Sequence, residues 1–266
     1  MNERRKDRKL LWNLVKNDFK QKFAGSYLGR IWAFVQPVVI VLVYWFAFEK
    51  GMKATVTNHL TGNAFPYLLW LVAGIVPWFY FSDALNAGVG ALLDYSYLVK
   101  KVVFKIELLP LVRVFSAVFV HCFFVLFAIL LYSFFGYMPD VYVLQVIYYS
   151  FGMILLAVSI AYFTSAVVVF FRDLTQVIGI VLNVGLWVTP IMWDINTLNI
   201  PETWIKIIKL NPMYYVVTGY RDAFINKVWF WEHTGTTLYF WLFVLGMFLL
   251  GRFVFKRLRV HFADVL

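Results

Sequence analysis

Residues 65–85 read FPYLLWLVAGIVPWFYFSDAL, and this stretch decides the fold class. Asp83 is its one acidic or basic residue. A helix needs about 20 mainly apolar residues to cross the hydrocarbon core of a bilayer, and the stretch meets that requirement. It therefore predicts a membrane-spanning helix, which Pro77 is expected to kink or break near its outer end.

Similar apolar runs recur along the chain. Together with the first they are residues 31–48, 65–85, 111–135, 143–171, 174–193 and 238–255. Of the 266 residues, 62% are hydrophobic and 14% are charged, whereas a soluble domain carries about 25% charged residues. We therefore predict an all-α integral membrane protein with one six-span transmembrane domain, residues 31–266. Pro190 is expected to kink or break the fifth span.

The first 30 residues differ from the rest, because they hold nine Lys and Arg residues. Apolar residues recur among them at helical spacing: Leu11, Leu14, Val15, Phe19 and Phe23. Residues 10–23 therefore predict an amphipathic helix in the bilayer interface, whereas residues 1–8 fit a disordered basic tail. Residues 1–30 are expected to form this cytoplasmic interface segment, which ends at a turn around Gly25 and Gly29.

The orientation follows from the distribution of Lys and Arg, which concentrate on the cytoplasmic side of membrane proteins. With the N-terminus inside, the inner segments hold 18 of them and the outer segments 6. Both termini are therefore predicted to lie in the cytoplasm. The net charge of +10 is interpreted as topology, and no nucleic-acid partner is expected.

The predicted outer segment between the last two spans, residues 196–232, contains two short apolar stretches. Asn211 and Pro212 separate them, and each stretch is too short to span a bilayer. A re-entrant helical hairpin that enters the outer leaflet and returns is the favoured interpretation. Two helices lying flat in the interface are the alternative.

A basic segment, DYSYLVKKVVFKIELLP, occupies Asp94–Pro110 between the second and third spans. It is too charged for hydrocarbon and too apolar for a solvated linker. The cytoplasmic loop 92–110 is therefore predicted to bind a second protein and transmit force through it. The residues expected to do so are Leu98, Val99, Lys100, Lys101, Val102, Val103, Phe104 and Lys105.

Motifs for catalysis and for metal binding are missing from the sequence. It contains no GxxxxGK[ST] phosphate-binding loop, no HExxH, and a single cysteine, Cys122. Neither a catalytic residue nor a metal or cofactor site is therefore expected in this chain. His121 lies inside the third span, and we interpret it as a hydrogen-bonding partner of a neighbouring helix.

Aromatic residues are abundant, at 21% of the chain. Many belong to the interfacial belts that border membrane spans. Some are also expected to line a wide passage in which the C–H faces of sugar rings stack on aromatic side chains. The candidate path residues are Trp78, Phe79, Tyr80, Asp83, Trp187, Trp193, Tyr214, Tyr215 and Arg221. A small-ion channel, which needs rings of carbonyls or charges, is disfavoured.

Four stretches together resemble the membrane-spanning subunit of ABC exporters that move polysaccharides and teichoic acids across the bacterial cell membrane. They are GSYLGRIWAFVQP (25–37), GIVPWFYF (74–81) followed by LVKKVVFKIELLPL (98–111), FFRDLTQV with WVTPIMW (170–193), and LNPMYYVVTGYRDAF (210–224). Lys105 departs from the family, which often has proline after the aromatic residue.

The resemblance implies two copies of this chain and two separate ATPase subunits, which would bind ATP and Mg²⁺. It implies that loop 92–110 carries a coupling helix docked in an ATPase groove. The substrate would be a polyprenyl-pyrophosphate-linked polymer entering from the inner leaflet, with Lys20, Lys22 and Arg30 as the nearest cations. Residues 214–222 resemble the teichoic-acid branch, which is the expected one.

Other functions stay open at this point. Within transport, they are an O-antigen or capsular polysaccharide exporter and an exporter of drugs or small amphiphiles. A membrane-embedded enzyme or an assembly scaffold is the alternative from another class.

Overall fold

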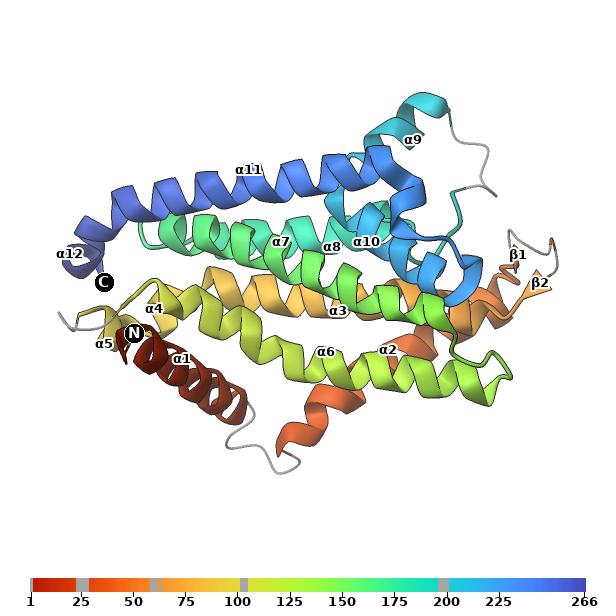
Figure 1. The fold of residues 1–266 in the computed structure, drawn as a ribbon, viewed down its shortest axis with the longest axis horizontal. Helices are drawn as coiled ribbons and strands as arrows, with labels where there is room; N and C mark the ends of the chain where they lie inside the picture. The colour runs from red at the N-terminus through yellow and green to blue at the C-terminus, as the bar shows by residue number, and fades with distance from the viewer. Residues whose placement is uncertain (1, 23–28, 58–61, 63, 101–104, 196–200) are drawn as a thin grey trace.

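A computed structural model describes residues 2–22, 29–57, 62, 64–100, 105–195 and 201–266. Long helices form a bundle in which most run roughly along one axis (Figure 1). Five described segments are long and apolar enough to cross a membrane: Trp32–Gly51, Tyr67–Val89, Leu108–Phe134, Val141–Val168 and Phe230–His261. Each corresponds to one of the predicted spans.

The predicted fifth span, residues 174–193, forms the shorter helix α8, Leu174–Val188. Its 15 residues extend about 23 Å, less than the roughly 30 Å of hydrocarbon in a bilayer. The helix ends because Thr189, which precedes Pro190, adopts an extended backbone. The break predicted at Pro190 is therefore confirmed.

The centre of the bundle is α3, Tyr67–Val89, which packs against α6, Leu108–Phe134, and α7, Gln145–Val168. Helix α3 is apolar on all sides, as expected for a fully surrounded helix, and most of its residues are buried. It continues through Pro77 without ending. The possible break at this proline does not occur, because neighbouring helices hold α3 on every side.

The outer helices are α2, Trp32–Trp45, which continues as a π-helix over Phe46–Gly51, and α11, Thr234–Leu258. Helices α2 and α8 leave wide apolar faces exposed. These faces comprise Ile31, Trp32, Val35, Val39, Leu42, Val43 and Phe46 at α2 and Val177, Ile180, Val181, Val184, Trp187 and Val188 on α8. Such faces contact lipid or another chain in a membrane protein.

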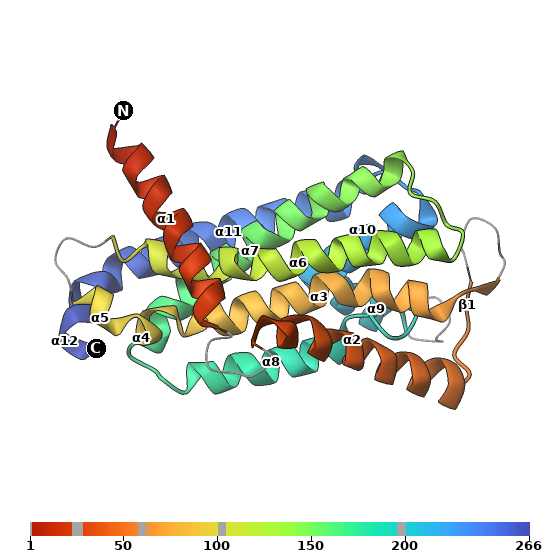
Figure 2. The same ribbon diagram turned by 90° about the horizontal axis from the view of Figure 1, so that it is seen from below.

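Both chain termini lie at one end of the bundle, called here the termini end (Figure 1). Helix α1, Asn2–Gln21, lies there and crosses the bundle obliquely against α6 (Figure 2). The disordered tail predicted for residues 1–8 is wrong from Asn2 onward, because the helix already includes these residues. Three short helices share this end: α4 (Ala91–Asp94), α5 (Ser96–Val99) and α12 (Phe262–Val265).

The opposite end is called the hairpin end. Its two-stranded sheet pairs β1, Val56–Thr57, antiparallel with β2, Ala64–Phe65, in the register Val56 to Phe65. Helices α9 (Glu202–Lys209) and α10 (Pro212–Arg221) also lie at this end. Short helical segments here and elsewhere along the chain are Gly29–Ile31, Val141–Leu144, Asp222–Asn226, Phe230–His233 and Arg259–His261.

The two helices of the predicted hairpin are unequal. Helix α9 is mostly exposed, whereas α10 is mostly buried against α3 and α7. Asn211 caps α10, because its side-chain oxygen accepts a hydrogen bond of 3.0 Å from the Met213 amide, and Pro212 occupies the first turn. The region therefore contains two short helices, and its depth in a bilayer stays a prediction.

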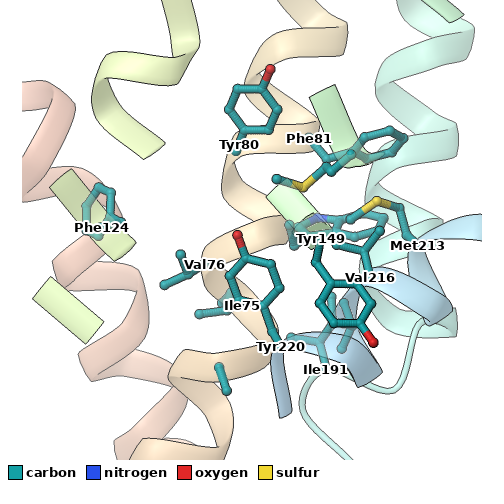
Figure 3. Close-up of a cluster of buried hydrophobic side chains, with 14 of the residues drawn as sticks. Ile75, Val76, Tyr80, Phe81, Phe124, Tyr149, Ile191, Met213, Val216 and Tyr220 are labelled. Carbon is teal, nitrogen blue, oxygen red and sulfur yellow. The ribbon is translucent and has the colours of Figure 1, made fainter. Parts of the chain in front are cut away.

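Helix α10 enters the main hydrophobic core. Met213, Val216 and Tyr220 lie in one cluster with Ile75 of α3 and Tyr149 of α7 (Figure 3). Gly219 permits this approach, because a Cβ atom at this position would lie 2.1 Å from the Tyr149 ring. The close contact between α10 and α7 therefore requires glycine.

Replacing Gly219 with alanine is expected to destabilise the protein. The added methyl group must displace α10 or the Tyr149 ring, and overpacking of this kind costs about 1–3 kcal/mol. Thermal unfolding in detergent should show a lower Tm for Gly219→Ala. The matched control is Gly246→Ala on α11, where nothing lies within 4 Å of the added atom. Equal Tm values for the two variants would contradict the packing described here.

Candidate functional site

A cavity of about 490 Å³ lies between α2, α3, α6 and α8, and α3 contributes more of its lining than any other helix. Its lining on α2 extends from Trp32 to Tyr44, a distance of about 18 Å along the helix axis. Gly185 allows α8 to approach α3, because its missing Cβ would lie 2.8 Å from the Trp78 ring. The cavity is therefore an elongated groove that follows the bundle axis.

The groove is lined by aliphatic, aromatic and neutral polar side chains. The aromatic ones are Trp32, Tyr44, Trp78, Phe79, Tyr80 and Phe124, and the neutral polar ones are Gln36, Ser82, Asn86, His121 and Asn183. Lys22 and Asp83 are the only acidic or basic residues among the described lining, and their side chains form an ion pair of 2.5 Å. A lining of this chemistry can contact a hydroxylated polymer without binding it tightly, so that the polymer could slide along the groove.

Four predicted path residues meet in this groove: Trp78, Phe79, Tyr80 and Asp83. Lys22, predicted as an entry cation, lies beside Asp83. Lys20 is exposed on α1 and does not line the groove. The side chain of Arg30 lies outside the part of the chain that the structure describes.

The other predicted path residues lie elsewhere. Trp187 is exposed on α8 and its carbonyl accepts a hydrogen bond of 2.9 Å from the Trp193 indole. Tyr215 is buried, and its hydroxyl lies 3.2 Å from that of Tyr148. Tyr214 and Arg221 line a separate cavity of about 280 Å³ at the hairpin end. The sequence-based list therefore combines two different regions.

The sequence-based predictions did not include the amide residues of the groove, although their position among apolar residues indicated a role for them. Gln36, Asn86 and Asn183 are amides inside or beside apolar runs, where they are expensive unless they have a role. His121 was interpreted as a hydrogen-bonding residue, and this is confirmed. Its Nε2 atom lies 3.0 Å from the Tyr220 hydroxyl of α10 and 3.1 Å from the Ser150 hydroxyl of α7.

Arg221 joins the broken end of α8 to α10. The residue is 9% exposed, and its guanidinium donates to the carbonyls of Pro190 at 2.6 Å and Ile191 at 2.9 Å. It also lies over the Trp70 ring, 3.4 Å from the ring centre. Gly74 leaves room for it, because a Cβ there would lie 2.9 Å from the guanidinium. Its described contacts are therefore those of a structural residue.

A buried polar cluster fixes α1 to the rest of the termini end. Asp18 of α1 is 2% exposed and forms an ion pair of 2.9 Å with Arg113 of α6. Asp18 also accepts hydrogen bonds of 2.5 Å from Tyr95 and from Ser116. Burial and the bond to Asp18 raise the pKa of the Tyr95 hydroxyl far above its ordinary value, so it remains a donor.

The same cluster contacts the segment that begins the predicted coupling loop. Arg113 pairs with Asp94 at 2.5 Å and lies over the Tyr95 ring, 4.9 Å from its centre. Lys105, in the second half of the same loop, pairs with Asp7 of α1 at 2.5 Å. Helix α1 is therefore tied by charge to both halves of the loop.

The structure places only part of the predicted coupling surface. Val99 is 7% exposed and packs in a small core with Leu92, Tyr95 and Phe262, so its side chain faces its own chain. Leu98 packs beside this core, whereas Lys100 and Lys105 are exposed. Tyr97, which was not predicted, is 58% exposed on α5. Lys101, Val102, Val103 and Phe104 lie outside the described residues.

Replacing Asp18 with asparagine should destabilise the protein strongly. The change leaves the Arg113 charge without its most deeply buried partner, and breaking a buried pair costs about 3–5 kcal/mol. Asp7→Asn is the matched control on the same helix, because the Asp7–Lys105 pair is partly exposed and such pairs contribute at most about 1 kcal/mol. Thermal unfolding in detergent compares the two, and equal losses would contradict the anchoring role of Asp18.

The long apolar helices are typical of an integral membrane protein, and this one contains a groove between four of its helices. A sequence profile described as "ABC-2 type transporter" matches residues 9–225, which is most of the chain. The chain belongs to this family. Membership makes it a multi-pass permease of the inner membrane and implies pairing with an ABC ATPase subunit.

Two relatives are similar to this chain over at least 80% of their own length. The O-antigen export system permease protein RfbA of Klebsiella pneumoniae is 25% identical over 259 residues, covering 97% of this chain and 95% of the relative. The protein of that name from Myxococcus xanthus is 28% identical over 220 residues, covering 82% and 80%. Their names favour the O-antigen alternative, and the expected teichoic-acid branch finds no support in them.

Proposed function

We propose that this chain is the permease of an exporter that moves a lipid-linked polysaccharide of the O-antigen type across the inner membrane. The observation that carries the proposal is the groove, whose aromatic and amide lining suits sugar rings and hydroxyl groups. The ion pair of Lys22 and Asp83 lies beside α1, where the phosphate groups of a lipid carrier would pass. The names of the relatives agree with this substrate class.

A second copy of the chain completes the passage in this proposal. Both α2 and α8 line the groove, and both helices also carry exposed apolar faces. Two such grooves facing one another would enclose a polymer between them. The apolar faces of α2 and α8 would then lie against the second copy or the surrounding lipid.

Two ATPase subunits drive the exporter in this proposal, and loop 92–110 transmits their motion. The exposed Tyr97 and Lys100 flank the segment that would enter the ATPase groove. Because Asp94 and Tyr95 contact Arg113 and Asp18, a displaced loop would move α6 and α1 together. The chain itself needs no catalytic residue for this role.

Removing the amides of the groove should reduce export. Gln36→Leu with Asn183→Leu deletes two polar side chains that line the groove and are exposed, so the fold should persist. Polysaccharide at the cell surface, measured in cells that depend on this chain and its ATPase, should fall at least about tenfold. Gln176→Leu is the control, because Gln176 is exposed on α8 outside the groove. Unchanged export in the double variant would refute the proposed path.

Substitutions in the coupling loop should uncouple the ATPase. Val102→Asp and Phe104→Asp place charges in the segment predicted to fill an apolar groove, so association should weaken at least about tenfold. Co-purification with the ATPase and ATP hydrolysis by the complex measure the effect. Met138→Asp, at an exposed position of the hairpin end, is the control. The coupling role is wrong if complex formation and hydrolysis survive both loop substitutions.

A further inference from the structure

A second cavity, of about 330 Å³, lies at the termini end where α11 meets α7 and the start of α6. Its aromatic walls are Tyr162, Phe248 and Phe255. The Tyr162 ring meets Phe255 and Phe248 nearly edge-on, with ring centres 5.5 and 6.3 Å apart. The Tyr162 hydroxyl donates to the Glu107 carbonyl at 3.0 Å. The walls are therefore held in place.

The polar side of this cavity carries excess positive charge. Arg252, Lys256 and Arg259 line it together with one acid, Glu107. Glu107 pairs with Arg259 at 2.5 Å. Within the described parts of the chain, no carboxylate lies within ion-pair distance of Arg252 or Lys256. The described lining therefore holds three cations and one carboxylate, and that carboxylate is paired with Arg259.

The position of these cations indicates the kind of anion. Residues four apart on a helix share a face, so Phe248, Arg252 and Lys256 project together. Leu249 and Phe253, beside them on α11, are 58% and 61% exposed, which marks a surface for lipid chains. The segment Phe230–His261 is 32 residues long, or about 48 Å, and exceeds the roughly 30 Å of hydrocarbon. The segment is therefore long enough for the last turns of α11 to reach the headgroup layer.

We propose that Arg252 and Lys256 bind the phosphate of a membrane-lipid headgroup in this cavity, with the acyl chains along Leu249 and Phe253. A guanidinium and an ammonium both form charge-assisted hydrogen bonds with phosphate. The aromatic walls exclude water on one side, and the exposed apolar residues extend the site into the bilayer. A soluble phosphate would contact only Arg252 and Lys256, whereas a lipid would contact these cations through its headgroup and Leu249 and Phe253 through its acyl chains.

The test is lipid retention by the purified full chain, measured by native mass spectrometry with phosphatidylglycerol as the probe. The wild type should retain it, and Arg252→Gln with Lys256→Gln should bind it at least about tenfold more weakly. Arg257→Gln is the matched control, because Arg257 is turned about 100° around the α11 axis from Lys256 and does not line the cavity. An equal loss in the control would show diffuse attraction to positive charge and overturn the site.

Two further arms make the outcome decisive. Glu107→Gln removes the negative charge beside the site and should tighten binding of phosphatidylglycerol, a gain that misfolding cannot produce. Glycerol phosphate, which has the same headgroup chemistry without acyl chains, should bind far more weakly than the lipid. If glycerol phosphate competes as well as the lipid, the cavity is a soluble-anion site and the lipid assignment is wrong.

Discussion

The arrangement of the hairpin end depends on the break that ends α8, because the backbone groups exposed there need hydrogen-bonding partners. A helix that stops inside a protein surrounded by hydrocarbon leaves carbonyls that water cannot satisfy. Here Arg221 bonds the carbonyls of Pro190 and Ile191, and the Tyr67 hydroxyl bonds that of Met192 at 2.7 Å. Asn211 donates to the Thr189 side chain at 2.8 Å. These bonds come from α3 and from both ends of α10, so the break in α8 and the insertion of α10 require one another.

At the termini end, ion pairs hold helix α1 in place. At the hairpin end, side-chain hydrogen bonds to backbone carbonyls hold the segment that follows α8. Helix α1 buries little apolar surface for its length, and Val15 is the one hydrophobic residue of its described side chains that is fully buried. Asp18 instead connects it to α6 and to the segment after α3. Such a contact is directional, because it needs the carboxylate and the guanidinium in register. In the proposed function, a movement of the loop would therefore also shift α1.

The sequence predicted the elements better than the contacts between them. Apolar runs identify membrane helices because the bilayer acts on each segment separately, and Pro190 marked the end of α8 through local backbone sterics. The pairing of Asp18 with Arg113 joins residues far apart in the chain, and no local pattern specifies it. Arg221 was predicted to line the substrate path, whereas its guanidinium bonds the carbonyls that follow α8, and these bonds depend on the fold. Val99 was assigned to a partner surface because its neighbours are charged, yet the fold buries it.

The groove has one more consequence, which concerns the membrane potential. A passage wide enough for sugars is also wide enough for protons and hydrated ions, and a cell cannot tolerate such a leak. Lys22 and Asp83 neutralise one another, and the other described lining residues are uncharged unless His121 takes up a proton. An ion entering the groove would lose part of its hydration and meet no fixed charge in return. If the groove is the polymer path, as proposed, the same largely uncharged wall would also disfavour the entry of ions while the polymer is absent.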